Sequence, residues 1–339
     1  MLVQSLLLLT GLGLILLAAE FFTNGIEEFG RHFSFSQAVV GSIFAAVGTA
    51  LPETILPFVA IFLYGGASAK EIGVGAILGA PFMLSTLAFF LVGITVAIAA
   101  VKKKRQFVLQ VEAQSIQRDL LFFLAMYSTA IILPIVAGKA MLIPISVALI
   151  GGYVFYAYRT FRSESAEMEH AEGMYLWRIT KKLTSRHLRE RPPLPLILFQ
   201  VVLALVVMIK GAHTFVHSLE RVSVTFGMDP LLFSLLLAPV ATELPEKFNS
   251  ITWTWKGRDT LALGNITGAM VFQSTFPVSV GLLFTDWEIT GMALFSAVLA
   301  IFSTLTVLGV ILARKRISPF AVLFGGILYL LYAAVLVLK

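Results

Sequence analysis

The sequence predicts an all-α polytopic membrane protein of about ten transmembrane helices in two inverted-topology five-helix repeats. Of the 339 residues, 58% are hydrophobic and only 13% are charged, and the mean hydropathy is +0.91. A soluble domain of this size does not need so much apolar surface. The apolar residues also fall into runs long enough to cross a bilayer, and a motif with proline and glutamate occurs once in each half.

The apolar runs define the elements in chain order. No Lys or Arg precedes the first run, so we expect a retained transmembrane helix rather than a cleaved signal peptide. The second and third runs exceed the length of one crossing, so these helices are expected to be tilted or broken. The first five runs span residues 3–25, 36–64, 72–101, 119–137 and 140–160. The second five span residues 194–217, 230–255, 261–284, 289–312 and 318–338.

Basic clusters orient these helices. They lie at Lys102–Arg105 after the third helix, at residues 159–191 after the fifth, and at Arg314–Arg316 after the ninth. With ten helices all three clusters fall on one side, which the positive-inside rule assigns to the cytoplasm. Both termini are then expected outside, and the compact loops favour a prokaryotic inner membrane. The net charge of +6 therefore reflects membrane topology and does not indicate nucleic-acid binding.

The chain divides into a first five-helix repeat (residues 1–160), a connector (161–193) and a second five-helix repeat (194–339). The connector is the only sizeable polar stretch, and it mixes acidic and basic residues. We expect it to be a solvated cytoplasmic link between the halves, because a regulatory domain needs more residues to build a core. The alternative is a short surface helix around Trp177.

A five-residue motif recurs in the two halves, as Thr49-Ala50-Leu51-Pro52-Glu53 and as Thr242-Glu243-Leu244-Pro245-Glu246. A carboxylate at membrane depth is costly and therefore indicates function. In each copy the threonine and the last glutamate are four residues apart and share a helix face. Each proline also leaves one backbone carbonyl without its helical donor. These carboxylate, hydroxyl and carbonyl oxygens are hard ligands of the kind that suits Ca²⁺ or Na⁺.

The repeat extends beyond the motif. Its offset of 193 residues (242 − 49) also relates Glu20 to His213, and a glycine segment follows each motif, at Gly75–Ala80 and at Gly264–Ala269. The paired glycines predict close helix approach. The second helix enters from the cytoplasm and the seventh from outside, an inverted arrangement typical of transporters with a midplane site. Two carboxylates can hold one divalent ion or, alternatively, monovalent ions or protons, which is a physical basis for exchange.

This arrangement resembles the cation/calcium exchanger superfamily, whose two α-repeats have the form G-T-S-x-P-E followed by a segment like G-N-x-x-G-S-N. The resemblance places the α-repeats at about residues 36–101 and 230–284. It implies ten helices in two inverted halves and antiport of Ca²⁺ against Na⁺ or H⁺ in a lipid bilayer. No cofactor is implied beyond the transported cations. The ion-binding carboxylates would be Glu53 and Glu246, with Thr49 and Thr242 beside them.

The chain departs from that pattern at several ligand positions, so the flanking sodium sites look depleted. This depletion slightly favours H⁺ over Na⁺ as the coupling ion. The missing ligands also leave open an alternative: a cation-binding or channel-like member of the fold that does not exchange ions and has a different substrate. The sequence leaves the oligomeric state open, and a monomer is compatible with it. The second glycine segment keeps Asn265, and Gln273 stands at a later acidic or amide position. Oxygen-bearing side chains are replaced at Ala50, Ala80, Leu84 and Ala269.

Further polar residues lie near the predicted site. Glu243 is a third candidate carboxylate, and Lys210 is a candidate internal cation to pair with it. The alternative is that Lys210 and Lys247 extend to the outer and inner membrane interfaces. His213 and His217 have metal-ligand spacing on one helix face, but interfacial positions are expected. The absence of cysteine excludes disulfides and zinc–thiolate sites, and no hydrolase or metalloprotease motif occurs, so no enzyme is predicted.

Overall fold

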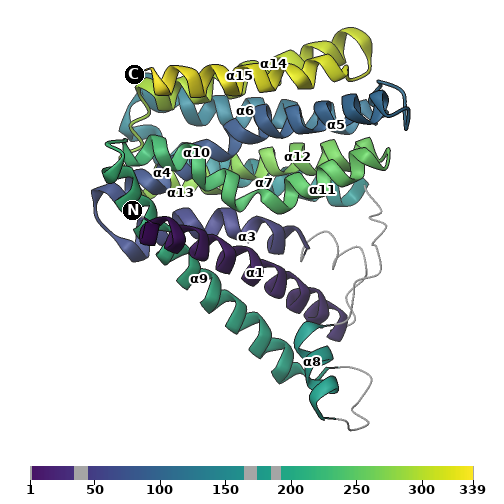
Figure 1. The fold of residues 1–339 in the computed structure, drawn as a ribbon. Coiled ribbons are helices and arrows are strands. Elements are labelled where there is room, and N and C mark those ends of the chain that lie inside the picture. Colours follow the sequence, from purple (N-terminus) through teal and green to yellow (C-terminus); the bar gives the residue numbers. More distant parts are fainter. Residues whose placement is uncertain (1, 34–44, 164–173, 185–191, 339) are drawn as a thin grey trace.

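The computed structural model describes residues 2–33, 45–163, 174–184 and 192–338. These residues form a helical bundle (Figure 1). Eight helical segments are long and apolar enough to cross a membrane, which confirms the all-α polytopic fold class. They are α1 (Leu2–His32), α4–η3–α5 (Ala67–Met83, Leu84–Ala88, Phe89–Val101), α6 (Ala113–Ala137), η4–α7 (Lys139–Met141, Leu142–Ser163), α9 (Leu194–Thr225), α12–α13 (Asp259–Gln273, Phe276–Phe284), α14 (Gly291–Arg314) and α15 (Pro319–Val337).

Two further predicted spans are broken into shorter helices. The span predicted at 36–64 contains α3 (Ala45–Phe58), which holds Pro52 and Pro57 and continues into the wider π-helical turns of η2 (Val59–Tyr64). The span predicted at 230–255 contains α10 (Pro230–Thr242) and α11 (Leu244–Trp255), which meet at Glu243. Proline removes a helical hydrogen bond and clashes with the preceding turn. The second span is interrupted within the recurring motif, at Glu243. In the first span the motif lies inside α3, and the helix widens only after Pro57.

Helices α1 and α9 form a layer of their own, inclined to the rest of the bundle (Figure 1). A Cβ atom on Gly11 would lie 2.9 Å from the carbonyl oxygen of Gly211, and one on Gly211 would lie 2.9 Å from that of Gly11. This backbone-to-backbone crossing holds the two helices together. Their apolar side chains form a cluster with those of α3, distinct from the larger core cluster of the remaining helices.

The predicted close approach at the glycine segments is correct for the first and wrong for the second. A Cβ atom on Gly75 would lie 2.2 Å from the carbonyl oxygen of Leu231, and one on Gly79 would lie 2.1 Å from that of Leu235. Only glycine therefore lets α4 pack on α10. On α12, by contrast, a Cβ atom at Gly264 would meet nothing within 4 Å.

The connector contains a short helix, α8 (Tyr175–Thr184), so the surface-helix alternative holds there; residues 164–173 and 185–191 lie outside the described chain. Trp177 is buried. The backbone N–H groups of Tyr175 and Leu176 donate to Asn24 Oδ1 on α1 (2.9 Å) and Gln200 Oε1 on α9 (3.1 Å). Gln200 also donates to Asn24 Oδ1 (3.1 Å). These bonds join α8, α1 and α9 into one unit.

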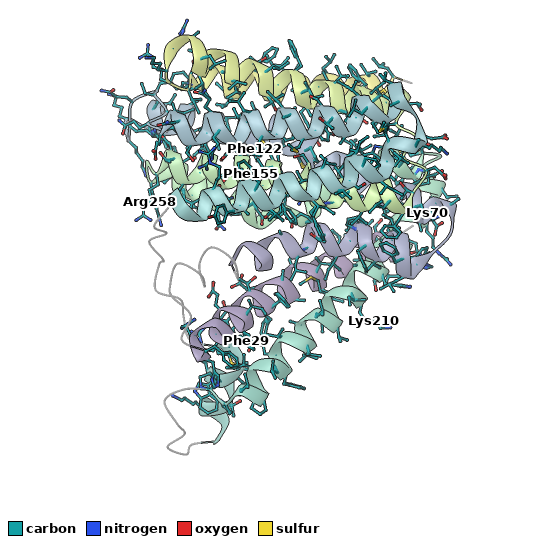
Figure 2. All side chains as sticks on the ribbon, turned by 180° about the vertical axis from the view of Figure 1, so that it is seen from behind. Phe29, Lys70, Phe122, Phe155, Lys210 and Arg258 are labelled. Carbon is teal, nitrogen blue, oxygen red and sulfur yellow. The ribbon has the colours of Figure 1, made fainter. Side chains whose placement is uncertain are left out.

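The basic loops described by the structure lie at one end of the bundle. The helices α5, α9 and α14 adjoin these loops. In Figure 1 their loop-bearing ends lie toward the right of the bundle, and both chain termini lie toward the left. In the reverse view, Arg258 and Lys70 likewise mark opposite ends (Figure 2). The ammonium of Lys104 lies 4.6 Å from the ring centre of Trp255 at the end of α11. The described basic loops therefore lie at one end of the bundle, as the predicted order of the helices requires.

An ion pair at this end fixes the start of α12. Arg105 donates to Asp259 Oδ1 and to the Thr254 carbonyl, each at 2.7 Å. The Asp259 side chain is fully buried, and its hydrogen bonds raise the pKa of the Arg105 guanidinium. The loop therefore keeps its positive charge.

We expect Arg105→Ala to destabilise the protein by about 3–5 kcal/mol, because the buried carboxylate of Asp259 loses the cation that pairs with it. Thermal unfolding in detergent measures the effect. The matched control is Arg316→Ala, which removes an exposed arginine from another basic loop and should change the midpoint little. Equal midpoints for the two variants would contradict the structural role of the pair.

Candidate cation site

Three glutamates from the recurring motif are buried in the bundle. Glu53 lies on α3, Glu243 at the junction of α10 and α11, and Glu246 in the first turn of α11. Their exposed fractions are 7%, 1% and 7%. Pro245 occupies the first turn of α11, where the missing N–H costs no helical bond, so the chain restarts as a helix directly after Glu243.

Each glutamate has one carboxylate oxygen that is buried without a hydrogen-bond partner: Oε2 of Glu53, Oε1 of Glu243 and Oε2 of Glu246. The carboxylate of Glu53 interacts electrostatically with those of Glu246 and Glu243 and with the ammonium of Lys247. A buried oxygen without a partner is costly. A bound cation or a proton would satisfy these oxygens.

Lys247 is the internal cation of this cluster. Its Nζ donates to Glu243 Oε2 at 3.0 Å, to the Pro239 carbonyl at 3.2 Å and to the sulfur of Met83 at 3.1 Å. Its exposed fraction is 5%. The expectation that Lys247 reaches the inner membrane interface is therefore wrong. The candidate pairing of Lys210 with Glu243 is also wrong, because Lys210 is exposed on the outer face of α9 (Figure 2).

The sequence signal for this pair is its spacing. Glu243 and Lys247 are four residues apart, with the glutamate first, which is the favourable order for a helical ion pair. The same spacing is common on exposed helix faces, so the sequence does not show that the pair is buried. The helix break at Glu243, the contact with Met83 on α4 and the low exposure appear only in the folded chain.

The other predicted ligands take different positions. Thr242 is buried, and its hydroxyl donates to the Ala238 carbonyl at 3.1 Å. The side chain of Thr49 lies outside the described residues. Asn265 donates to the backbone carbonyl of Glu246 at 3.3 Å, so it supports α11 rather than a carboxylate. Gln273 is buried at the end of α12.

The two histidines of α9 lie apart from the three buried glutamates of the motif. His213 is exposed. The Tyr64 hydroxyl lies 2.8 Å from Nδ1 of His217 and donates to Oε2 of Glu220, also at 2.8 Å. In the part of the chain that the structure describes, no group of three or more His, Asp and Glu side chains has the arrangement of a metal site. The candidate site is thus a paired-glutamate site completed by an internal lysine, not a preformed cage.

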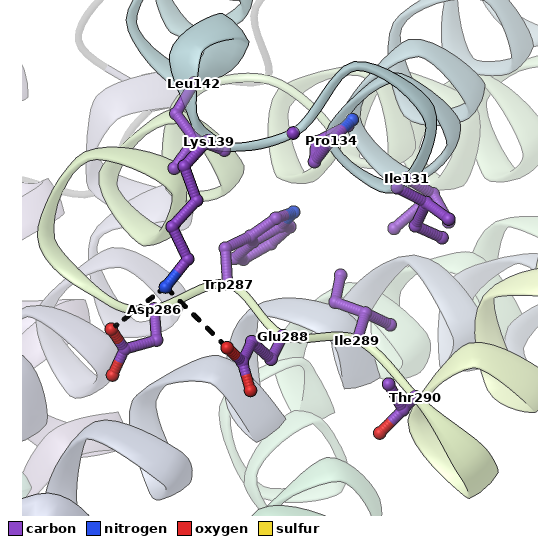
Figure 3. A pocket seen from close by; sticks show the side chains of 11 residues that line it. Ile131, Pro134, Lys139, Leu142, Asp286, Trp287, Glu288, Ile289 and Thr290 are labelled. Atoms are coloured by element: carbon purple, nitrogen blue, oxygen red, sulfur yellow. Dashed lines mark ion pairs between the residues drawn. The ribbon is translucent and has the colours of Figure 1, made fainter.

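A surface pocket of about 280 Å³ lies elsewhere. Figure 3 shows Lys139 between Asp286 and Glu288, at 3.8 and 3.7 Å. All three side chains are largely exposed, and the pocket contains none of the buried glutamates. Solvent screens exposed pairs of this kind, so this pocket carries no functional assignment.

Known proteins resemble this chain in sequence and in fold. The chain matches the sodium/calcium exchanger protein family over residues 3–162 and 196–339. CaxA of Alkalimonas amylolytica, provisionally designated an antiporter, is 25% identical over 353 aligned positions, which cover 98% of this chain and all of CaxA. The inner membrane protein YrbG of Escherichia coli is 23% identical over 86% of this chain and 83% of its own length.

Two solved structures share the fold. The H⁺/Ca²⁺ exchanger CAX superposes with a TM-score of 0.70 at 19% identity, covering 99% of this chain and 81% of its own. The sodium–calcium exchanger NCX_Mj superposes with a TM-score of 0.56 at 20% identity, covering 98% of this chain and 99% of its own. At these identities the likeness concerns the fold.

Proposed function

Because the chain belongs to the sodium/calcium exchanger protein family, we propose that it is a secondary antiporter that exchanges Ca²⁺, or a related cation, for Na⁺ or H⁺. It is a multi-pass integral membrane protein and a transporter rather than an enzyme. The observation that carries the proposal is the pair of buried glutamates from the two repeats, Glu53 and Glu246, each with an oxygen that lacks a partner.

The chemistry of the pair accounts for exchange. Ca²⁺ prefers several carboxylate and carbonyl oxygens at 2.3–2.6 Å, and two carboxylates match its charge. When Ca²⁺ leaves, the same oxygens need monovalent cations or protons, because empty buried carboxylates repel each other. Glu53 and Glu246 are therefore occupied by one class of cation or the other, and the transport cycle alternates between them.

Alternating access requires that the site open to each side in turn. The unit formed by α1, α8 and α9 has its own glycine crossing. Its apolar side chains pack in one cluster with those of α3, the helix that carries Glu53. We assign the movement to this unit, which slides past the rest of the bundle. The basic loops then face the cytoplasm by the positive-inside rule, with both termini outside and the protein in a prokaryotic inner membrane.

H⁺ is the favoured coupling ion. Ala80 on α4 and Leu84 at the start of η3 are buried and bring no oxygen to the site. Fewer oxygens leave fewer places for Na⁺, whereas a proton needs only one carboxylate oxygen. Na⁺ remains the alternative, and the experiment below separates the two.

The test is uptake of ⁴⁵Ca²⁺ into proteoliposomes that contain the purified protein, with an outward H⁺ gradient or an outward Na⁺ gradient imposed separately. We expect uptake driven by the H⁺ gradient and absent from protein-free liposomes. Uptake driven by Na⁺ alone would reassign the coupling ion. Uptake that follows only the Ca²⁺ gradient would indicate the channel-like alternative, and no uptake by folded protein would reject calcium transport.

A further inference from the structure

The buried cluster has a definite charge count when its groups are ionised. Glu53, Glu243 and Glu246 contribute three negative charges and Lys247 contributes one positive charge, which leaves two negative charges. One divalent cation, or two monovalent cations, therefore neutralise the site. Without the lysine, the same carboxylates need one more cation.

The ammonium of Lys247 is held in place rather than mobile. It has three acceptors on three parts of the fold: Glu243 at the helix break, Pro239 on α10 and Met83 on α4. Only one of these acceptors is charged, and a thioether is a weak one. The one charged acceptor, Glu243, forms an ion pair with the ammonium at 3.0 Å, and both side chains are almost fully buried. Its nearest carboxylate, Glu243, keeps its second oxygen unpartnered.

We propose that Lys247 is a built-in cation of the transport site, occupying the place beside Glu243 that a monovalent ion would otherwise fill. This inference deepens the proposed antiport and rests on it for the identity of the transported ions. Lys247 cannot leave, so the site binds Ca²⁺ without a second, co-bound monovalent cation. Lys247 is thus a specificity-determining residue that acts through Glu243.

The alternative is a purely structural pair that fixes the junction of α10 and α11. The two roles differ in their dependence on charge. A structural pair predicts that Lys247→Met and Glu243→Gln each only weaken the fold. A built-in cation predicts opposite changes in what the site binds, because Lys247→Met leaves three negative charges and Glu243→Gln leaves one. The double variant E243Q/K247M returns to two.

The experiment is exchange of ⁴⁵Ca²⁺ for unlabelled Ca²⁺ across proteoliposomes at about pH 8.5, with and without Na⁺ on both sides. We expect Na⁺ to raise the rate of Ca²⁺ exchange by K247M at least about 5-fold. Na⁺ should not change the exchange rate of wild type or of the conservative variant K247R. E243Q should need at least about 10-fold more Ca²⁺ for half-maximal exchange, because one negative charge remains. In E243Q/K247M both the effect of Na⁺ on exchange and the Ca²⁺ concentration for half-maximal exchange should return to the wild-type range. The proposal is overturned if Na⁺ stimulates exchange by K247M no more than exchange by wild type and E243Q needs no more Ca²⁺ than wild type.

A second readout separates this proposal from the antiport itself. Thermal unfolding in detergent reports binding without transport, since a ligand that binds the folded state raises its stability. Na⁺ should raise the unfolding midpoint of K247M but not that of wild type or E243Q/K247M. If wild type fails to exchange Ca²⁺, antiport of Ca²⁺ is rejected while the Na⁺-dependent midpoint still decides the role of Lys247. If K247M does not fold, E243Q and the double variant carry the test.

Discussion

Replacing Glu53 or Glu246 by glutamine is expected to lower gradient-driven cation exchange at least about 100-fold while leaving the protein folded. Glutamine keeps the size of the side chain and can still accept hydrogen bonds, but it cannot supply a negative charge. A factor of 100 corresponds to about 2.7 kcal/mol, which is modest for the loss of one of two carboxylates that face a divalent ion. The two variants should behave alike, since the two residues hold equivalent positions in the inverted repeats.

The measurement is ⁴⁵Ca²⁺ uptake in proteoliposomes with matched protein content. Glu71→Gln makes the same chemical change at an exposed position of α4 and should leave uptake unchanged. Glu53→Asp keeps the charge but shortens the side chain, so it should retain part of the activity with a weaker apparent affinity. Normal uptake in both glutamine variants would show that the buried pair is not the transport site.

The sequence predicts the principal carboxylates and most of the bundle because their signals are local. Apolar runs of membrane-spanning length give the helices, and a carboxylate beside a proline within such a run predicts both a break and a site. The recurrence of the motif makes chance improbable. The structure accordingly has α3 and η2 where a long or broken second helix is expected, and it breaks the seventh helix at Glu243.

The remaining features depend on contacts between distant segments. Lys247 and Lys210 both stand among apolar residues, and only the packing of α4 on α10 shows that the first is enclosed and the second exposed. The two glycine segments have the same spacing, yet of their glycines Gly75 and Gly79 approach another backbone closely whereas Gly264 and Gly268 do not. The crossing of α1 and α9 at Gly11 and Gly211 carries no comparable motif.

The movement of α9 can be stopped by tying it to η2. Tyr64 at the end of η2 lies against a row of potential metal ligands on α9: His213, His217 and Glu220. The Tyr64→His variant would complete a site for Zn²⁺, which binds imidazole and carboxylate groups in tetrahedral geometry. We expect micromolar Zn²⁺ to stop exchange by this variant almost completely, because the metal would tie α9 to η2. A chelator should restore exchange.

Two features of the chain make this test specific. The protein has no cysteine, so Zn²⁺ has no thiolate to bind elsewhere, and the described wild-type chain has no three-residue His/Asp/Glu metal group. Tyr64→Phe removes the hydroxyl without adding a ligand, so it should be insensitive to Zn²⁺. A Zn²⁺-dependent rise in the unfolding midpoint would show that Tyr64→His binds the metal. If that variant binds Zn²⁺ and still exchanges Ca²⁺ at the normal rate, α9 does not move past η2, and alternating access must use another pair of surfaces.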